Sequence, residues 1–350
     1  MKKILLVLLT AITFSACQSR EDEKVVRIGA IFPMTGVASY AADFMKKGLD
    51  LAVQELNTTS DYKYEVIYED SRALAKDGLI AYNKLRAQKV NLIICAMSNI
   101  GMAVAPRTNN ESAILFGTAI VPPNFVAVSN RVVRVGPNSE GMTSVIADYN
   151  HCYLKLKRPA VVYINNDMGF DCYKVYTNIA AKYACDVVYS EAYESNQKDF
   201  KDIINKIIQQ NVDGVYLSGF GESFISFVRQ FNNDPRTSNI VLTGDMTFGL
   251  PDTQAKMGEL KSKIYYADGT ITKDFADLYR CNYAEEVNSY AAYTYTIPYM
   301  IDAALKSGCS PNDIDGIYNY ITSHTFNSSV GELYFTSNGE SNIKFSIKVL

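Results

Sequence analysis

Side chains with binding chemistry follow several short β-like runs of the sequence. Ser98 and Asn99 come shortly after the apolar run 92–96, and Asp245 comes shortly after the run 240–242. A hydroxyl beside the free N–H groups of a helix start can hold a carboxylate, and an aspartate can pair with a ligand ammonium. The same residues are also ordinary helix caps, so the sequence leaves both interpretations open.

Two further loops carry apolar side chains that a ligand can contact. Phe220 lies between Gly219 and Gly221, and glycines allow a close approach of the backbone. Met168 lies in the segment 166–170, after the run 160–164, and offers an adaptable apolar wall. Simple turn formation is the alternative for the second segment.

Catalytic and metal-binding patterns are missing from these loops. The sequence has no GxSxG elbow, P-loop or HExxH motif, and its two histidines, His151 and His324, lie elsewhere. No CxxC pair or Cys/His cluster is available for zinc, and no spacing forces two of the 37 acidic residues together. We therefore expect no catalytic residue, no metal site and no cofactor, and a protein that binds a small molecule without changing it.

The elements that would position these loops alternate between strand and helix. β-rich runs at 25–32, 64–68, 92–96 and 114–116 are separated by helical stretches at 40–56, 76–88 and about 99–109. A second series begins with the run 160–164 and continues to the run 264–267. This rhythm is typical of parallel sheets covered by helices, which bind ligands at the carboxyl ends of their strands. The sequence predicts an α/β fold of two lobes between which the chain crosses repeatedly, as in a hinged clam.

Length and charge narrow the class of protein. A chain of 350 residues is long enough for two cores, and 48% hydrophobic with 20% charged residues is ordinary for a globular protein. The net charge of −3 gives no attraction for polyanions, so nucleic acid is not an expected partner.

The first residues carry an export signal. Lys2 and Lys3 precede the apolar run 4–14, and Ser15 and Ala16 are small residues before Cys17. The sequence Phe-Ser-Ala-Cys resembles a bacterial lipoprotein signal, in which the cysteine is acylated. We expect a signal peptide at 1–16, lipidation of Cys17, a solvated tether at 17–24, and a protein held on a membrane outside the cytoplasm. A membrane-spanning helix is the weaker alternative, because the run is short.

Six cysteines remain after Cys17, in a compartment where disulfides persist. Their pairing cannot be deduced from the sequence, although Cys95 lies in an apolar run that predicts a buried free thiol. The six residues are Cys95, Cys152, Cys172, Cys185, Cys281 and Cys309.

Segments along nearly the whole mature chain resemble one family. Residues 28–36 read Ile-Gly-Ala-Ile-Phe-Pro-Met-Thr-Gly, and residues 47–57 read Lys-Gly-Leu-Asp-Leu-Ala-Val-Gln-Glu-Leu-Asn. Tyr-Glu-Asp at 68–70, Ala-Val-Ala-Pro at 103–106 and Gly-Glu-Leu at 331–333 follow in order. These segments resemble the leucine/isoleucine/valine-binding family of ABC-transporter substrate-binding lipoproteins.

This resemblance implies a type I periplasmic-binding-protein fold. Two Rossmann-like lobes with parallel-rich sheets would be joined by a hinge of three crossings. We expect residues 25–136 and 270–328 in the first lobe, and residues 137–269 and 329–350 in the second.

Matching to the family's binding positions also implies a set of ligand contacts. The expected contacts are Tyr40, Ser98, Asn99, Thr118, Ala119, Met168, Phe220 and Asp245. Three positions depart from the family's pattern: Ile120 stands where a hydroxyl residue is usual, and Met168 and Phe220 stand where tyrosine is common. The expected ligand is thus an amino acid or a related amide or carboxylate, with its identity left open.

The resemblance implies delivery of this ligand to an ABC importer. Permease spans and an ATP-binding motif are missing from the sequence, so the permease and ATPase would be separate subunits. We expect a monomer. The alternative is a lipoprotein that reports its ligand to a membrane receptor without transport.

Overall fold

The computed structural model describes residues 24–36 and 38–350. The expected signal peptide, Cys17 and all of the expected tether except Lys24 lie outside the described residues. Within the described part, no helix has the length and apolar character needed to cross a membrane.

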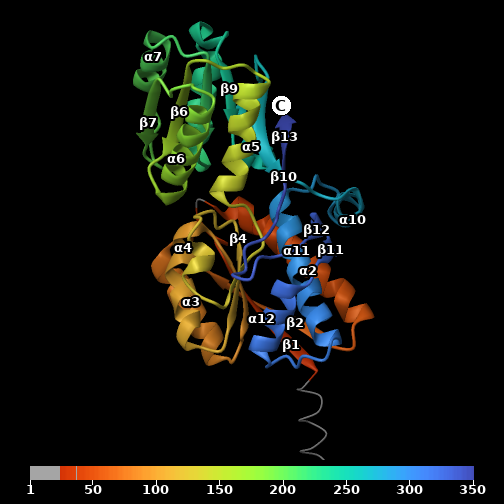
Figure 1. Ribbon diagram of the computed structural model, residues 1–350. Helices are drawn as coiled ribbons and strands as arrows, with labels where there is room; N and C mark the ends of the chain where they lie inside the picture. The colour runs from red at the N-terminus through yellow and green to blue at the C-terminus, as the bar shows by residue number, and fades with distance from the viewer. Residues whose placement is uncertain (1–23, 37) are drawn as a thin grey trace, which may run out of the picture.

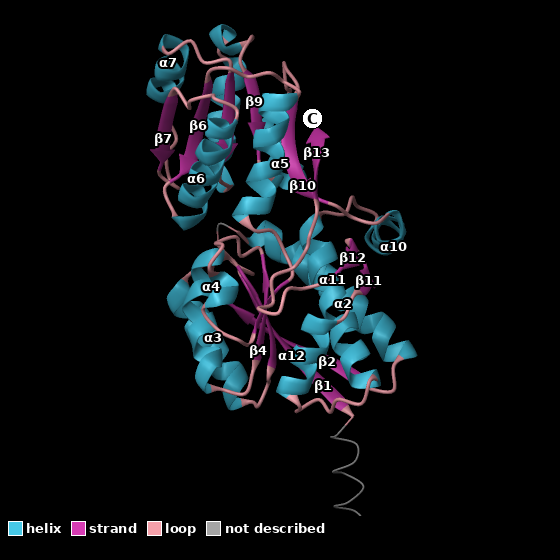
Figure 2. Cartoon of the chain, in the orientation of Figure 1, coloured by secondary structure: helices cyan, strands magenta, loops and turns pink. Residues whose placement is uncertain are grey.

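Two sheets form the centres of two lobes (Figures 1 and 2). The first sheet has the order β2-β1-β3-β4-β5, and all of its neighbouring strands are parallel. These strands are β1 (Val25–Phe32), β2 (Lys63–Asp70), β3 (Leu92–Ala96), β4 (Ile114–Thr118) and β5 (Val132–Arg134). Strands β3, β4 and β5 are wholly buried, as expected for a sheet with helices on both faces.

Helices from both ends of the chain cover the first sheet. In Figure 2, α3 (Ala75–Ala87) and α4 (Ser98–Val104) lie on one side of it. Helices α2 (Ser39–Thr59), α11 (Ser289–Lys306) and α12 (Ile314–Ser323) lie on the other side, and α11 and α12 come from the C-terminal part of the chain. The 3-10 turn η1 (Ala105–Asn110) follows α4 and leads to β4, and the 3-10 turn η2 (Phe125–Ala127) lies between β4 and β5.

Helices α2 and α11 approach each other very closely. A Cβ atom on Gly48 of α2 would lie 2.1 Å from the carbonyl oxygen of Ala291, so only glycine permits the contact. Thr294 of α11 donates from Oγ1 to the carbonyl oxygen of Met45 at 2.8 Å. This contact fastens the returning part of the chain to the first lobe.

The second sheet repeats the strand order of the first. Its order is β13-β10-β9-β8-β6-β7, in which only β13 is antiparallel. The strands are β6 (Pro159–Ile164), β7 (Tyr189–Tyr193), β8 (Gly214–Ser218), β9 (Val241–Gly244), β10 (Ile264–Gly269) and β13 (Phe345–Val349). In both sheets the first strand of the series lies beside the third, and this switch point is where open sheets bind ligands.

The second lobe is completed by helices between its strands. These are α5 (Ser139–Cys152), α6 (Asp167–Lys182), α7 (Lys201–Gln209), α8 (Gly221–Asn233) and α9 (Pro251–Met257), with the turns η3 (Pro235–Thr237) and η4 (Met246–Gly249). A strongly amphipathic α7 places Ile203, Ile204 and Ile207 in the core of this lobe.

The chain crosses between the lobes three times, after β5, after β10 and before β13. The second crossing leads through α10 (Lys273–Tyr283) to α11. After α12 the chain forms a hairpin of β11 (Phe326–Ser328) and β12 (Gly331–Leu333) before the third crossing. The predicted α/β class with parallel-rich sheets is confirmed. Strand pairing keeps residues 331–333 with residues 326–328, so the hairpin continues the segment 270–328 that is expected in the first lobe.

Candidate functional site

A cavity of about 310 Å³ lies between the two lobes, at the carboxyl ends of both sets of strands. Six of the eight expected contacts line it. They are Tyr40, Ser98, Asn99, Ala119, Met168 and Phe220. The contacts come together because the loops after parallel strands lie at the carboxyl edge of each sheet, and these two edges face the same cavity.

The first lobe contributes the loops after β3 and β4. Ser98 begins α4, and its Oγ accepts a hydrogen bond from the backbone N–H of Val121 at 3.3 Å. Its hydroxyl proton is therefore still available to a ligand oxygen. Met97, which follows β3, and Ala119, which follows β4, have φ values of 75° and 49°. Non-glycine residues adopt such positive φ values only at a cost in free energy.

The second lobe contributes the loops after β6 and β8. Asn166 caps α6 by accepting from the N–H of Gly169 at 2.9 Å, which sets the start of the helix that carries Met168. Gly219, just before Phe220, has a φ of 151°, and a Cβ there would lie 1.8 Å from the hydroxyl oxygen of Tyr193. Glycine at 219 therefore allows the backbone to turn Phe220 into the cavity wall.

Much of the remaining cavity surface is apolar, and four of its side chains are methionines. They are Met97, Met142, Met168 and Met246, one from the first lobe and three from the second. Methionine adapts its shape and makes favourable contacts with aromatic groups. The wall can therefore accommodate an aliphatic or an aromatic ligand group.

Asp245 lies behind this wall and does not line the cavity. Its carboxylate is fully buried and accepts from Ser218 Oγ at 3.1 Å, from the N–H of Gly219 at 3.2 Å and from the N–H of Thr247 at 3.0 Å. Burial raises the pKa of Asp245, and these hydrogen bonds oppose the increase. Asp245 thus holds the loops that carry Phe220 and Thr247 to the cavity.

Thr118, the last residue of β4, is the other expected contact that does not line the cavity. It is fully buried, and its Oγ1 has no hydrogen-bond partner among the described residues. Its neighbour Ala119 takes the place at the cavity wall.

Ile120 is not part of the cavity, and its hydrophobic character follows from packing. Its side chain is fully buried and packs against Gly101 of α4. The packing is so close that a Cβ atom on Gly101 would lie 2.2 Å from Cδ1 of Ile120. A hydroxyl at this position would be buried in an apolar cluster without a partner. The departure at Ile120 therefore gives no information about the ligand.

Among the described residues, the charged side chain that lines the cavity is acidic. Asp167 lines it, and the linings include no lysine or arginine from the described residues. Burial raises the pKa of Tyr40, and the charges of Asp245 and Asp252 raise it further. A ligand with a positive group is stabilised by this field, whereas a simple anion is not.

Asp268, near the end of β10, is a half-buried carboxylate near the hinge. One of its oxygens accepts from Ser289 Oγ at 2.9 Å and from the N–H of Gly269 at 2.7 Å. Burial raises its pKa to about 6, and Asp245 contributes in the same direction. The bond to Ser289, the first residue of α11, joins the two lobes beside the cavity.

Sequence reasoning missed several residues of the cavity wall. Tyr290 comes from the start of α11, and Pro137 comes from the first crossing. Neither follows a strand of its own lobe in the chain, so the rule that ligands bind at βα loops does not find them. Met246 and Thr247 follow Asp245 directly and line the cavity in its place, so the expected contact on this loop is displaced by one or two residues.

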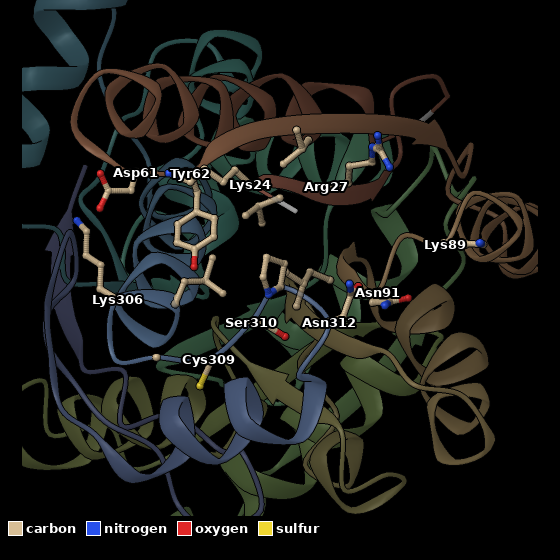
Figure 3. Close-up of a pocket in the computed structure, with 16 residues that line it drawn as sticks. Lys24, Arg27, Asp61, Tyr62, Lys89, Asn91, Lys306, Cys309, Ser310 and Asn312 are labelled. Carbon is tan, nitrogen blue, oxygen red and sulfur yellow. The ribbon is translucent and has the colours of Figure 1, made fainter. Parts of the chain in front are cut away.

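A larger hollow of about 1110 Å³ lies at the other end of the first lobe (Figure 3). Its lining includes Arg27 and Lys306, and these cations pair with Glu65 at 3.7 Å and with Asp302 at 2.7 Å. It lies at the amino ends of β1 and β3, away from the converging helix starts, and only the first lobe lines it. The cavity between the lobes is the better candidate.

No group of three or more potential metal ligands occurs among residues 24–36 and 38–350. All six cysteines after Cys17 are free thiols, and the predicted burial of Cys95 is confirmed. Two parallel α/β lobes with a ligand-sized cavity between them define a class of protein: two-lobed solute-binding proteins.

Comparison with known proteins places the chain within this class. The family model described as periplasmic binding protein matches residues 25–344, so the chain belongs to that family. A Leu/Ile/Val-binding protein of Escherichia coli is 22% identical over 97% of this chain and 93% of its own length. A Leu/Ile/Val-binding protein homologue of Brucella melitensis is 22% identical over 65% of this chain and 62% of its own length.

Solved structures show the same fold with two kinds of ligand. A branched-chain amino acid binding protein of Streptococcus pneumoniae, in complex with isoleucine, has a TM-score of 0.81 at 18% identity, covering 93% of this chain and 99% of its own. A solute-binding protein of an ABC transporter from Rhodopseudomonas palustris, in complex with 3,4-dihydroxybenzoic acid, has a TM-score of 0.83 at 17% identity, covering 93% of both chains. These likenesses establish the type I periplasmic-binding-protein fold. The chain is thus a member of the periplasmic binding proteins, a family that works outside the cytoplasm.

The raised pKa of Asp268 predicts how one substitution changes stability with pH. A folded-state pKa of about 6 lies above the ordinary 3.8, so Asp268 destabilises the protein as pH rises from about 4 to above 6. Asp268→Asn removes the charge and should increase the free energy of unfolding at pH 7.5. The gain should stay below about 3 kcal/mol, since one pKa unit corresponds to about 1.4 kcal/mol and the side chain is partly exposed.

Urea unfolding of both proteins at pH 7.5 and pH 4 measures this difference. At pH 4 the wild-type carboxyl is protonated when folded, and the advantage of Asn should largely disappear. An equal difference at the two pH values would contradict the raised pKa.

Proposed function

We propose that this protein captures a small amino acid or a closely related zwitterion and delivers it to an ABC importer. The observation that supports the proposal best is the cavity of about 310 Å³ to which loops of both lobes contribute. Hinge closure around such a cavity buries the ligand and replaces its hydration with protein contacts. Tyr40, Ser98, Asn99, Ala119, Met168 and Phe220 are the proposed contacts.

The sign of the charge around the cavity selects among ligands. The relatives include proteins solved with isoleucine and with 3,4-dihydroxybenzoic acid. A benzoate has a negative charge at neutral pH and would meet Asp167 with no cationic side chain in the lining. An amino acid carries an ammonium group that compensates this field, so we propose the zwitterion rather than the aromatic anion.

The two ends of the zwitterion have different proposed places. The carboxylate would lie in the first lobe, at the Ser98 hydroxyl and the backbone N–H groups at the start of α4. The ammonium would face the second lobe, toward Asp167 and the buried charge of Asp245. Asp245 acts through its field and through the loops it holds, since its oxygens already accept three hydrogen bonds.

The remaining part of the ligand would lie against the apolar wall. Met168 and Phe220 stand there, and neither has the hydroxyl that a tyrosine would supply. We propose an apolar or aromatic side chain on the ligand, because a polar one would lose its hydrogen bonds with water without replacement.

The family and the N-terminal sequence support a proposal for the location and partners. We propose that Cys17 is acylated, that residues 1–16 are removed, and that a short tether holds the lobes near the membrane. A separate permease and ATPase would receive the ligand, and the protein would act as a monomer.

We also propose residues 25–136 and 270–333 as the first lobe, with the second lobe formed by residues 137–269 and the end of the chain.

A thermal-shift screen tests the ligand class. A ligand that binds only the folded state raises the free energy of unfolding by roughly 2.7 kcal/mol when its concentration is a hundred times Kd, and the melting temperature rises with it. We expect L-leucine, L-isoleucine, L-methionine or L-phenylalanine to raise it by several degrees. A response to 4-hydroxybenzoate with none to the amino acids would refute the proposed zwitterion.

A substitution at Ser98 tests where the carboxylate binds. Ser98→Ala removes one hydrogen bond to a charged group and should weaken binding of the best amino acid about 10-fold to 100-fold. Ser195→Ala is the matched control, because Ser195 lines the cavity from the second lobe and should change the affinity less than threefold. Calorimetric titration measures both, and equal losses would place the carboxylate elsewhere.

A substitution at Cys17 tests the anchor. Wild-type protein expressed in its native cells should fractionate with membranes and should take up radiolabelled palmitate. Cys17→Ser should lose both properties, while Cys281→Ser, at an exposed thiol far along the chain, should keep them. Membrane association that survives in Cys17→Ser would show that Cys17 is not the anchor.

A further inference from the structure

A buried arginine lies at the start of the first crossing. Arg134, the last residue of β5, is fully buried and donates to the carbonyl oxygens of Ile120 and, at 2.6 Å, Pro122. Its Nε donates to Glu340 at 3.0 Å. A buried guanidinium needs such partners, because its desolvation is costly when one of them is removed.

The same glutamate also holds the first helix of the second lobe. The other oxygen of Glu340 accepts from Asn138 Nδ2 at 2.9 Å. Asn138 in turn caps α5, with its Oδ1 accepting from the N–H of Gly141 at 2.6 Å. Because Glu340 belongs to the third crossing, one carboxylate joins the first crossing, the third crossing and the start of α5. The backbone supports this junction, since Arg134 N–H donates to the carbonyl oxygen of Gly339 at 2.9 Å.

The junction is continuous with the cavity. Val121 lies between Ile120 and Pro122, the two residues held by Arg134, and it lines the cavity. Its N–H donates to Ser98 Oγ, and its carbonyl oxygen accepts from the N–H of Ser139, the first residue of α5, at 3.0 Å. The loop that contacts the ligand is therefore bonded directly to the element that begins the second lobe.

We infer that Glu340 is a positioning residue of the hinge: by bonding Arg134 and Asn138 together, it sets the angle at which α5 leaves the first lobe. Helix α5 carries this angle into the second lobe, because it packs against α6, β10 and β13. Glu340 does not line the cavity and acts only through its two partners. Ligand contact with Ser98 and Val121 is thereby coupled to the orientation of the lobes.

The test removes the bond to α5 while keeping the helix cap. Asn138→Ser retains a side-chain oxygen for the N–H of Gly141, since serine caps helices about as well as asparagine, but it has no amide to donate to Glu340. Donor and acceptor dyes on non-canonical residues at Lys76 of α3 and Lys182 of α6, both exposed, report the distance between the lobes. Single-molecule measurements on the full ligand-free protein make the result independent of the proposed ligand.

We expect Asn138→Ser to shift the distribution of transfer efficiency or to broaden it, with a melting temperature within about 3 °C of the wild type. Asp313→Ser is the matched control, because Asp313 caps α12 by accepting from the N–H of Gly316 and has no bond to a crossing. It should leave the distribution unchanged.

A second variant acts on the same junction from the third crossing. Glu340→Gln keeps the shape of the side chain but replaces one of the two acceptor oxygens with an NH2 group. The glutamine can therefore accept a hydrogen bond from Arg134 or from Asn138 in the present geometry, but not from both. It should shift the distribution in the same direction as Asn138→Ser, and the double variant should shift it no further than the larger single effect. Wild-type distributions in both single variants would overturn the assignment, even where the melting temperature falls.

Discussion

The facing carboxyl ends of two parallel sheets are the constraint on which the structure depends. Each sheet places its helix starts at one edge, and three crossings bring those edges together with a cavity between them. Hydrogen bonds tie the crossings to one another: Arg134 N–H donates to the carbonyl oxygen of Gly339, and Thr270 N–H donates to that of Lys344 at 3.1 Å. The third crossing is thus bonded to both others. Ligand contacts and hinge contacts lie within a few residues of each other for this reason.

Charge distinguishes this cavity from a general apolar cleft. Asp167 lines it, the carboxylate of Asp245 is buried behind it, and that of Asp268 is half-buried nearby, with the pKa values of Asp245 and Asp268 raised. Such burial costs free energy in the ligand-free protein unless a positive group enters the cavity. The same carboxylates accept hydrogen bonds that shape the wall, so they contribute to structure before any ligand is present. The cost of burying these carboxylates and the selectivity that we propose for a cationic group have one origin.

The sequence was sufficient for the fold and for several of the loops that form the cavity. Strand and helix alternation predicts parallel sheets, and in such sheets Ser98 and Phe220 must lie on loops at the binding edge. Two kinds of information were not available. Tyr290 reaches the cavity only because the chain returns to the first lobe, which no local pattern encodes. Ile120 is buried in the core beyond the end of β4, after a residue with positive φ, and the alternation of side chains along a strand does not extend to it.

Native mass spectrometry of the protein, purified without refolding, identifies the solute that is held between the lobes. We expect one bound solute per chain whose mass and fragments show both an amine and a carboxylate, released when the lobes unfold. A bound aromatic acid without an amine would contradict the selectivity that we derive from Asp167 and the buried carboxylates. It would leave the two-lobed fold and its hinge unaffected.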